Sequence, residues 1–150
     1  MDNLEIEVFS EKHQIKDIYS LIAESQAEGH RHLTRLLDEY ESGANRFKEP
    51  GEALFIAIHK ATIIAICGLN RDPYSKNKSV GRVRRLYVSR PFRRTGVAQK
   101  LMKYVIDLAR ENFEILVLRT DNPIADLFYK KLGFIDKTND EGSSHYLILN

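Results

Sequence analysis

Between Val80 and Leu118 the sequence passes from a strand pattern into a long amphipathic helix and then into a short buried strand. Val80–Val88 reads as the first strand, and Ile115–Leu118 reads as the second. The helix is expected from about Gly96 to Asn112, with a buried stripe made of Val97, Leu101, Tyr104, Val105 and Leu108. A helix of this length between two strands predicts a mixed α/β domain.

The remaining apolar patterns add elements on both sides of this segment. Alternation predicts a strand at Leu4–Val8, and helical spacing predicts two helices, one capped by Ser10 and one carrying Leu33–Tyr40. The later predicted elements are a hairpin of Ala53–Ile58 with Thr62–Leu69, a helix at Asn122–Leu132, and strands at Phe134–Ile135 and Tyr146–Leu149. The order β-α-α-β-β-β-α-β-α-β-β predicts one α/β (α+β) domain over residues 1–150, with a mixed sheet flanked by helices.

Composition narrows the class of protein. Hydrophobic residues make up 43% and charged residues 29% of the 150 residues, as in soluble globular proteins. With 23 basic and 21 acidic residues the net charge is only +2, which argues against a nucleic-acid-binding protein. Cys67, the single cysteine, lies in an apolar run and is expected to be a buried structural thiol. The N-terminus does not resemble a signal peptide and no apolar run approaches a membrane span, so we expect a cytoplasmic protein with no membrane partner.

The turn before the long helix has the composition of an anion site. Backbone N–H groups at a helix N-terminus lack intrahelical acceptors, and the helix dipole adds positive charge there. Gly96 lets the backbone approach a phosphate, Ala98 keeps the helix start narrow, Arg93 and Arg94 add charge, and Thr95 offers a hydroxyl. A capped helix with solvated arginines would give the same pattern, so this turn alone leaves both interpretations open.

Two segments together resemble the GCN5-related N-acetyltransferase (GNAT) superfamily. The family's phosphate turn, Gln/Arg-x-x-Gly-x-Gly/Ala, matches Arg93-Arg94-Thr95-Gly96-Val97-Ala98. A second signature, N-x-x-A-x-x-F-Y-x-K-x-G-F, falls on Asn122, Ala125, Phe128, Tyr129, Lys131, Gly133 and Phe134. The strand Arg85-Leu86-Tyr87-Val88 before the turn also fits. The resemblance covers about residues 80 to 135 and implies the family's mostly antiparallel sheet.

The resemblance implies an acetyl-CoA site and assigns its residues. The backbone of Leu86, Tyr87 and Val88 would pair with the pantetheine arm as an added strand would. The turn from Arg93 to Ala98 (Arg93, Arg94, Thr95, Gly96, Val97, Ala98) would hold the pyrophosphate. Asn122, Ala125, Phe128 and Lys131 would complete the cofactor site. Tyr129 would be the catalytic residue, directing its hydroxyl at the sulfur as a general acid.

The implied reaction is direct attack by a primary amine on acetyl-CoA in a ternary complex. Many family members carry a glutamate on the strand before the turn, whereas this sequence carries Arg82, Arg84 and Arg85 there, so the general base is unassigned. Carboxylates considered for that role are Glu28, Glu39, Glu52 and Asp121, each of which also reads as a surface charge. An arginine facing the acceptor cleft would indicate a small anionic acceptor, whereas salt bridges to neighbouring elements are the structural alternative.

Other functions remain as alternatives at this point. A protein lysine or N-terminal acetyltransferase would use the same fold, and so would a non-catalytic acyl-CoA-binding regulator. The pair His30 and His32 reads as polar residues at a helix start rather than as metal ligands, so no metal is expected. A homodimer is compatible with the sequence, which does not specify it.

Overall fold

The fold is described by a computed structural model, which places residues 3–137 and 142–150. The strands are β1 (Leu4–Val8), β2 (Ala53–His59), β3 (Thr62–Arg71), β4 (Val80–Val88), β5 (Ile115–Leu118), β6 (Ile135–Asp136) and β7 (His145–Ile148). The helices are α1 (Tyr19–Ala27), α2 (His32–Ser42), α3 (Val97–Asn112) and α4 (Pro123–Lys131), with short 3-10 helices η1 (Ile15–Ile18) and η2 (Arg90–Phe92). The predicted order of strands and helices is confirmed.

The strands form one mixed sheet in the order β1-β2-β3-β4-β5-β7-β6. Neighbours are antiparallel except β4 and β5, which are parallel. The predicted hairpin joins β2 to β3 through Lys60 and Ala61, both at positive φ (49° and 65°). This is the backbone of a two-residue hairpin turn that usually contains glycine or asparagine, so its sequence signal was weak.

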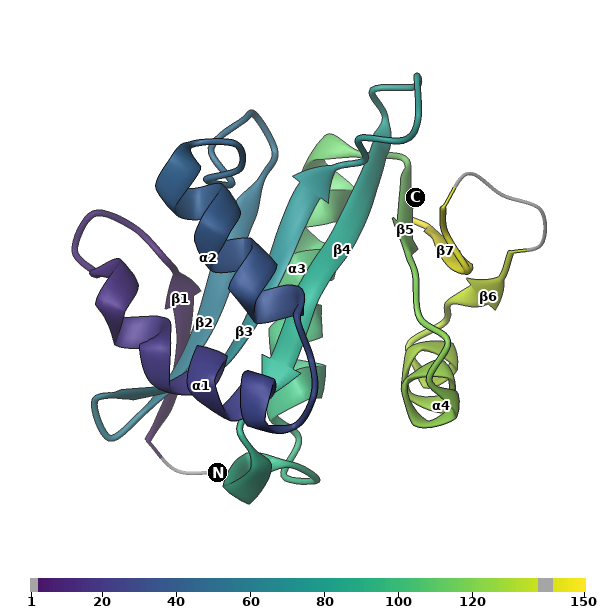
Figure 1. Cartoon of the computed structure of the whole chain (residues 1–150). Helices are drawn as coiled ribbons and strands as arrows, with labels where there is room; N and C mark the ends of the chain where they lie inside the picture. Colours follow the sequence, from purple (N-terminus) through teal and green to yellow (C-terminus); the bar gives the residue numbers. More distant parts are fainter. Residues whose placement is uncertain (1–2, 138–141) are drawn as a thin grey trace.

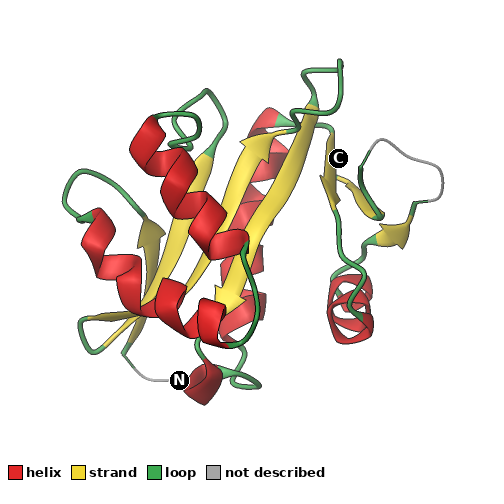
Figure 2. Ribbon diagram, viewed as in Figure 1, coloured by secondary structure: helices red, strands yellow, loops and turns green. Residues whose placement is uncertain are grey.

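Helices cover both faces of the sheet, as Figures 1 and 2 show: α1 and α2 lie on one face and α3 on the other. On the first face, Ile18, Leu33 and Leu36 pack in a core with Ile56 and Ile66 of the sheet. On the second face, buried residues of α3 pack in another core, which extends to Tyr129 of α4 and Phe134 beyond it. The sheet therefore separates two apolar cores.

Two expectations about the helices need correction. Tyr104 was expected in the buried stripe of α3, but its side chain is 47% exposed, and Met102 and Ile106 are buried there instead. Ser10 does not cap the first helix. The helical segment begins at Ile15, and the N–H of Gln14 donates to a carboxylate oxygen of Asp17 at 2.9 Å.

In the described ranges no helix has both the length and the apolar character needed to cross a membrane.

A bulge in β4 at Arg85 changes which side chains share a face. Arg85 has a φ of +63°, and the register of β4 against β3 shifts at this point. Simple alternation would put Arg84 on one face with Leu86 and Val88. Instead, Arg84 lines a pocket beside α2, on the side where Tyr87 joins the core under α1 and α2, while Leu86 and Val88 pack against the core on the α3 side. The bulge thus turns the side chain of Tyr87 toward α1.

Candidate functional site

β4 and β5 run together for only three register pairs and then separate. β5 pairs with Val80, Gly81 and Arg82, whereas the rest of β4 has its sheet partner in β3 alone among the described residues. In Figure 1 the two strands lie side by side at one end and diverge toward α4. The predicted cofactor strand, Leu86–Val88, lies on this unpaired stretch of β4. A free strand edge offers backbone donors and acceptors to an extended ligand.

The predicted phosphate turn joins the end of β4 to α3. Gly96 is the residue before the helix, with a φ of +89°, and a Cβ built on it would meet nothing within 4 Å. Within the part of the chain that the structure describes, the N–H groups of Val97, Ala98 and Gln99 bond to no protein acceptor. Thr95 donates its hydroxyl to the carbonyl of Phe92. The turn therefore presents an open backbone surface beside free helix amides.

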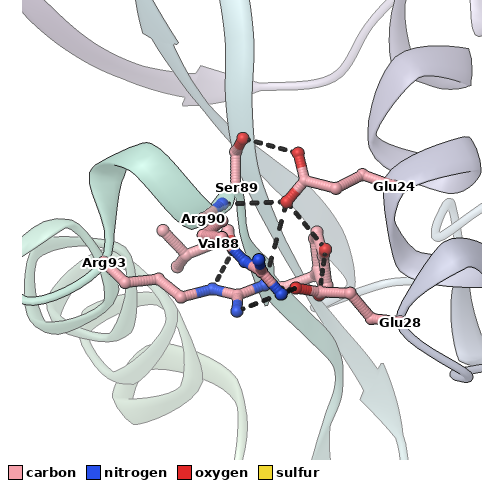
Figure 3. A network of polar contacts seen from close by, with 7 residues as sticks. Glu24, Glu28, Val88, Ser89, Arg90 and Arg93 are labelled. Atoms are coloured by element: carbon pink, nitrogen blue, oxygen red, sulfur yellow. Dashed lines mark hydrogen bonds and ion pairs between the residues drawn. The ribbon is translucent and has the colours of Figure 1, made fainter.

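Arg93 lies in a different place from the one expected of a phosphate ligand. Its guanidinium donates to both oxygens of Glu28, at 2.7 Å and 3.1 Å, and to the carbonyl of Val88 at 2.9 Å. Figure 3 shows this guanidinium directed across the end of β4 toward α1. Arg94 is exposed and forms no ion pair with a described residue. Of the two arginines in the turn, Arg94 is the one available to an anion.

Two glutamates, Glu24 on α1 and Glu28 just after it, hold the turn in place. Glu24 accepts from the hydroxyl of Ser89 at 2.7 Å and from the N–H of Arg90 at 2.8 Å. The hydroxyl of Tyr87 lies 2.6 Å from an oxygen of Glu28 and 2.8 Å from one of Glu24. Glu28 was interpreted as a surface charge, and that interpretation is wrong. The i, i+4 spacing of the two glutamates, which places them on one side of the helical segment, was the available signal.

Tyr129 is a buried residue in the last turn of α4. It is 7% exposed, and its ring contacts those of Phe128 and Phe134 at centroid distances of 5.2 Å and 5.6 Å. Burial, and after it the neighbouring thiol of Cys67, raises the pKa of the phenol. Among the described residues, none forms a hydrogen bond with its hydroxyl. A phenol with a raised pKa remains protonated at neutral pH and can donate a hydrogen bond.

The other signature residues lie along α4. Asn122 caps the helix by accepting from the N–H groups of Ile124 at 2.8 Å and Ala125 at 3.2 Å. The cap uses the side-chain oxygen, so the amide NH₂ has no partner in the described part of the molecule. Ala125 and Phe128 are half-buried against the core on the α3 side, and Lys131 is exposed.

Comparison with known proteins supports this architecture. The sequence matches the profile of the acetyltransferase (GNAT) family over residues 13–134. The chain belongs to the GNAT acetyltransferase family. A comparison with curated proteins finds no relative of this sequence.

Solved structures share the GNAT fold over nearly the whole chain. A protein of Exiguobacterium sp. 255-15 with a provisional acetyltransferase designation is 28% identical, with a TM-score of 0.85, covering 99% of this chain and 94% of that one. A GNAT acetyltransferase of Staphylococcus aureus Mu50 is 19% identical, with a TM-score of 0.75 and coverage of 98% and 99%. The AtaT toxin, in a variant bound to the C-terminus of the antitoxin AtaR and to acetyl-CoA, is 14% identical, with a TM-score of 0.69 and coverage of 99% and 94%.

β4 carries three arginines where the GNAT resemblance suggested a glutamate. Two of these arginines, Arg82 and Arg85, form salt bridges. Arg82 donates to Asp72 at 2.8 Å, with both side chains 6% exposed. Arg85 pairs with Glu39 of α2 at 3.1 Å. The salt-bridge interpretation therefore holds for these two arginines.

Cys67 is fully buried, and burial raises the pKa of its thiol to about 12, so it cannot serve as the nucleophile of this GNAT domain.

One group of possible metal ligands lies beside α4. Asp126, Asp136 and His145 bring one ligand atom each within 4.8 Å of one another. Lys130 pairs with both aspartates at 3.1 Å, and His145 lies 2.6 Å from Asp126. Lys130 and His145 therefore already contact the aspartate carboxylates, and this cluster links α4 to β6 and β7.

The carboxylate of Glu28 makes the turn sensitive to pH. Hydrogen bonds from Arg93, and after it from Tyr87, lower its pKa from 4.5 to about 2. Because the folded-state pKa lies below the ordinary value, Glu28 stabilises the fold above about pH 4.5, and this contribution is lost as the pH falls toward about 2. In Glu28→Gln we expect a melting temperature below that of the wild type at about pH 7, with a gap that closes below about pH 4.5.

Thermal melts across this pH range check the prediction. Glu41→Gln, which removes an exposed glutamate of α2, is the matched control and should follow the wild type throughout. A gap for Glu28→Gln that stays constant between about pH 7 and about pH 3 would contradict the assigned role of the carboxylate.

Proposed function

We propose that this chain transfers an acetyl group from acetyl-CoA to the primary amine of a small molecule, by direct attack in a ternary complex. The observation that carries the proposal is the edge of β4 at Leu86–Val88, which has no strand partner on the β5 side among the described residues. The turn before α3 follows this edge along the chain, and Tyr129 of α4 belongs to the core on the α3 side, against which Leu86 and Val88 also pack. Membership of the GNAT family supports acetyl transfer, and the AtaT variant bound to acetyl-CoA has the same fold.

The residues present fit the proposed co-substrate. The free N–H groups of Val97–Gln99 and the dipole of α3 suit the pyrophosphate, and Gly96 leaves the approach open. The edge at Leu86–Val88 suits the amide-rich pantetheine arm. Arg94 adds a charge at the mouth of the site. When bound, acetyl-CoA supplies an activated acetyl group.

Tyr129 is proposed to stabilise the departing thiolate. At reference pKa values, about 8.5 for a thiol and about 10 for tyrosine, full proton transfer to sulfur is uphill by about 2 kcal/mol. Burial raises the pKa of Tyr129 and so adds to this cost. The phenol is therefore better suited to donate a hydrogen bond to the developing charge than to give up its proton completely.

The acceptor amine must be neutral before it attacks. Holding a lysine-like amine neutral at pH 7 costs roughly 4.6 kcal/mol, whereas an α-amino group costs only about 1 to 1.4 kcal/mol. Glu28 and Glu39 are already paired with arginines, and Glu52 accepts from the N–H of Arg71 at 2.8 Å. Of the four carboxylates considered as the general base, the exposed Asp121 is therefore the one that pairs with no described residue.

A thermal melt with acetyl-CoA tests the cofactor site. A ligand at about 100 times its Kd adds roughly 2.7 kcal/mol, which should raise the melting temperature of the wild type by about 5–10 °C. Arg94→Glu should reduce the rise, because it places a negative charge beside the pyrophosphate. Arg35→Glu, at an exposed position of α2, is the matched control and should keep the full rise.

The outcome also separates the remaining functions. No rise in the folded wild type would refute the proposal. A rise without acetylation of any amine would favour an acyl-CoA-binding regulator, and acetylation confined to peptides would favour a protein acetyltransferase.

A further inference from the structure

Arg84 differs from the two neighbouring arginines of β4 in having no ion-pair partner. Arg82 pairs with Asp72 and also donates to the carbonyl of Gly142 at 3.0 Å, and Arg85 pairs with Glu39. The guanidinium of Arg84 is half-buried and forms no hydrogen bond or salt bridge with any residue that the structure describes. A partly desolvated cation without a partner is costly, and a bound anion would offset that cost.

Arg84 lines a pocket of about 620 Å³. The pocket lies between the loop after α2, the end of β3 and the residues that follow it, with Glu39, Asn45, Asn70 and Tyr74 on its walls. The amides of Asn45 and Asn70 bond to each other, at 2.9 Å and 3.0 Å. The side-chain amides of Asn45 and Asn70 thus satisfy each other's hydrogen bonds in the lining of the pocket.

Charge in the pocket favours an anionic ligand. Its cationic residues are Arg46, Lys48, Arg71 and Arg84, and its acidic residues are Glu39, Glu49 and Glu52. Glu39 is neutralised from outside the pocket by Arg85. Burial, and after it the positive charge of Arg85, lowers the pKa of Arg84, while Glu39 acts in the opposite direction. The pocket therefore has an excess of positive charge, with Arg84 as its half-buried member.

The distance along β4 limits the size of the ligand. Arg84 comes two residues before Leu86, where the predicted cofactor edge begins, with the bulge at Arg85 between them. Because an extended chain spans at most about 3.6 Å per residue, the two positions are at most about 7 Å apart. A molecule that reaches both needs only a few bonds between its amine and its acidic group.

We propose that Arg84 binds the acidic group of the acceptor in this pocket, so that the acceptor is a small amine carrying a carboxylate or a phosphate a few bonds from its nitrogen. This inference rests on the proposed acetyl transfer and names its substrate class. A guanidinium can bind either anion through two parallel hydrogen bonds, which a neutral acceptor cannot match.

Binding of matched probes tests the inference. Titration calorimetry in the presence of CoA compares β-alanine with β-alaninamide, and phosphoethanolamine with ethanolamine, on the wild type. We expect the acidic member of at least one pair to bind at least tenfold more tightly than the member without an acidic group. The pair that shows this difference distinguishes carboxylate from phosphate. In Arg84→Gln this preference should be lost, while the weaker binding of the neutral amines stays within about twofold.

Further variants show whether Arg84 acts by direct contact. Lys16→Gln removes an exposed cation outside the pocket and should keep the preference within about twofold, because general attraction depends weakly on one exposed charge. Arg84→Lys keeps the charge but loses the two-pronged contact, and serves as the second variant if Arg84→Gln does not fold. Equal binding to the wild type of probes with and without an acidic group would overturn the inference, as would equal losses in Arg84→Gln and Lys16→Gln.

The result is independent of the test of acetyl transfer. If acetyl-CoA raises the melting temperature and neutral amines are acetylated without an acidic preference, the proposed function stands and the role of Arg84 is refuted. If acidic probes bind but acetyl-CoA does not, the pocket is an anion site and the acetyl-transfer proposal fails.

Discussion

Replacing Tyr129 with phenylalanine is expected to lower kcat by roughly 100-fold or more, with little loss of affinity for acetyl-CoA. The substitution removes one oxygen from a side chain that is 7% exposed and leaves the ring contacts with Phe128 and Phe134 in place. No described residue depends on the hydroxyl for a hydrogen bond, so the fold should be nearly unaffected. The hydrogen bond to the departing sulfur would be lost only in the transition state, which is why kcat should fall rather than binding.

Steady-state kinetics with saturating acetyl-CoA measure this effect, and the acetyl-CoA-induced rise in melting temperature reports on binding. Tyr104→Phe is the matched control, because Tyr104 is a half-exposed tyrosine of α3 outside the proposed site. An unchanged kcat in Tyr129→Phe would remove this residue from the mechanism. A loss of both kcat and acetyl-CoA binding would assign it a structural role instead.

Replacing Arg82 with methionine is expected to lower the free energy of unfolding by about 3–5 kcal/mol. Arg82 and Asp72 form an ion pair at 2.8 Å in which both side chains are 6% exposed. Removing the guanidinium leaves the carboxylate of Asp72 buried without its charged partner. For a domain of this length the loss corresponds to a fall of roughly 6–20 °C in melting temperature.

Denaturant titration and thermal melts measure this loss. The double variant Arg82→Met with Asp72→Leu should recover most of the stability, because an apolar pair of similar size removes the unpaired charge. A single variant that melts within about 2 °C of the wild type would show that the pair contributes little. Since Arg82 precedes Arg84 on the same strand, this pair anchors the strand that carries the proposed acceptor contact.

Long periodic segments made most of the fold predictable. The strand Val80–Val88 and the helix Val97–Asn112 carry enough repeats for their pattern to specify the type of element. Tyr129 and Gly96 were assigned through the GNAT resemblance, because a single tyrosine or glycine has no distinguishing pattern of its own. The structure places Gly96 at the start of α3 and Tyr129 in the core on the α3 side, and their roles stay predictions.

The features that sequence reasoning missed depend on contacts between distant residues. Glu28 and Arg93 lie 65 positions apart, and no local periodicity relates two residues across that distance. The GNAT resemblance allows a bulge in this strand, but its place at Arg85 has no marker in the sequence, because a non-glycine residue adopts the positive φ. A prediction that ignores the bulge would put Arg84 on the same face as Leu86 and Val88, away from the pocket that it lines.

The bulge at Arg85 also has a consequence for how chains with this fold can diverge. Before it, Arg84 lines the pocket proposed for the acceptor. After it, Leu86–Val88 present a backbone edge whose hydrogen-bonding groups are the same for almost any side chain. A substitution at position 84 can therefore alter which acceptor is selected without disturbing the edge that would hold the acetyl donor. β4 thus combines a side chain, at position 84, whose substitution would change the acceptor with a backbone edge that most substitutions leave unchanged. On this proposal, single amino-acid changes at position 84 give new acceptor specificities.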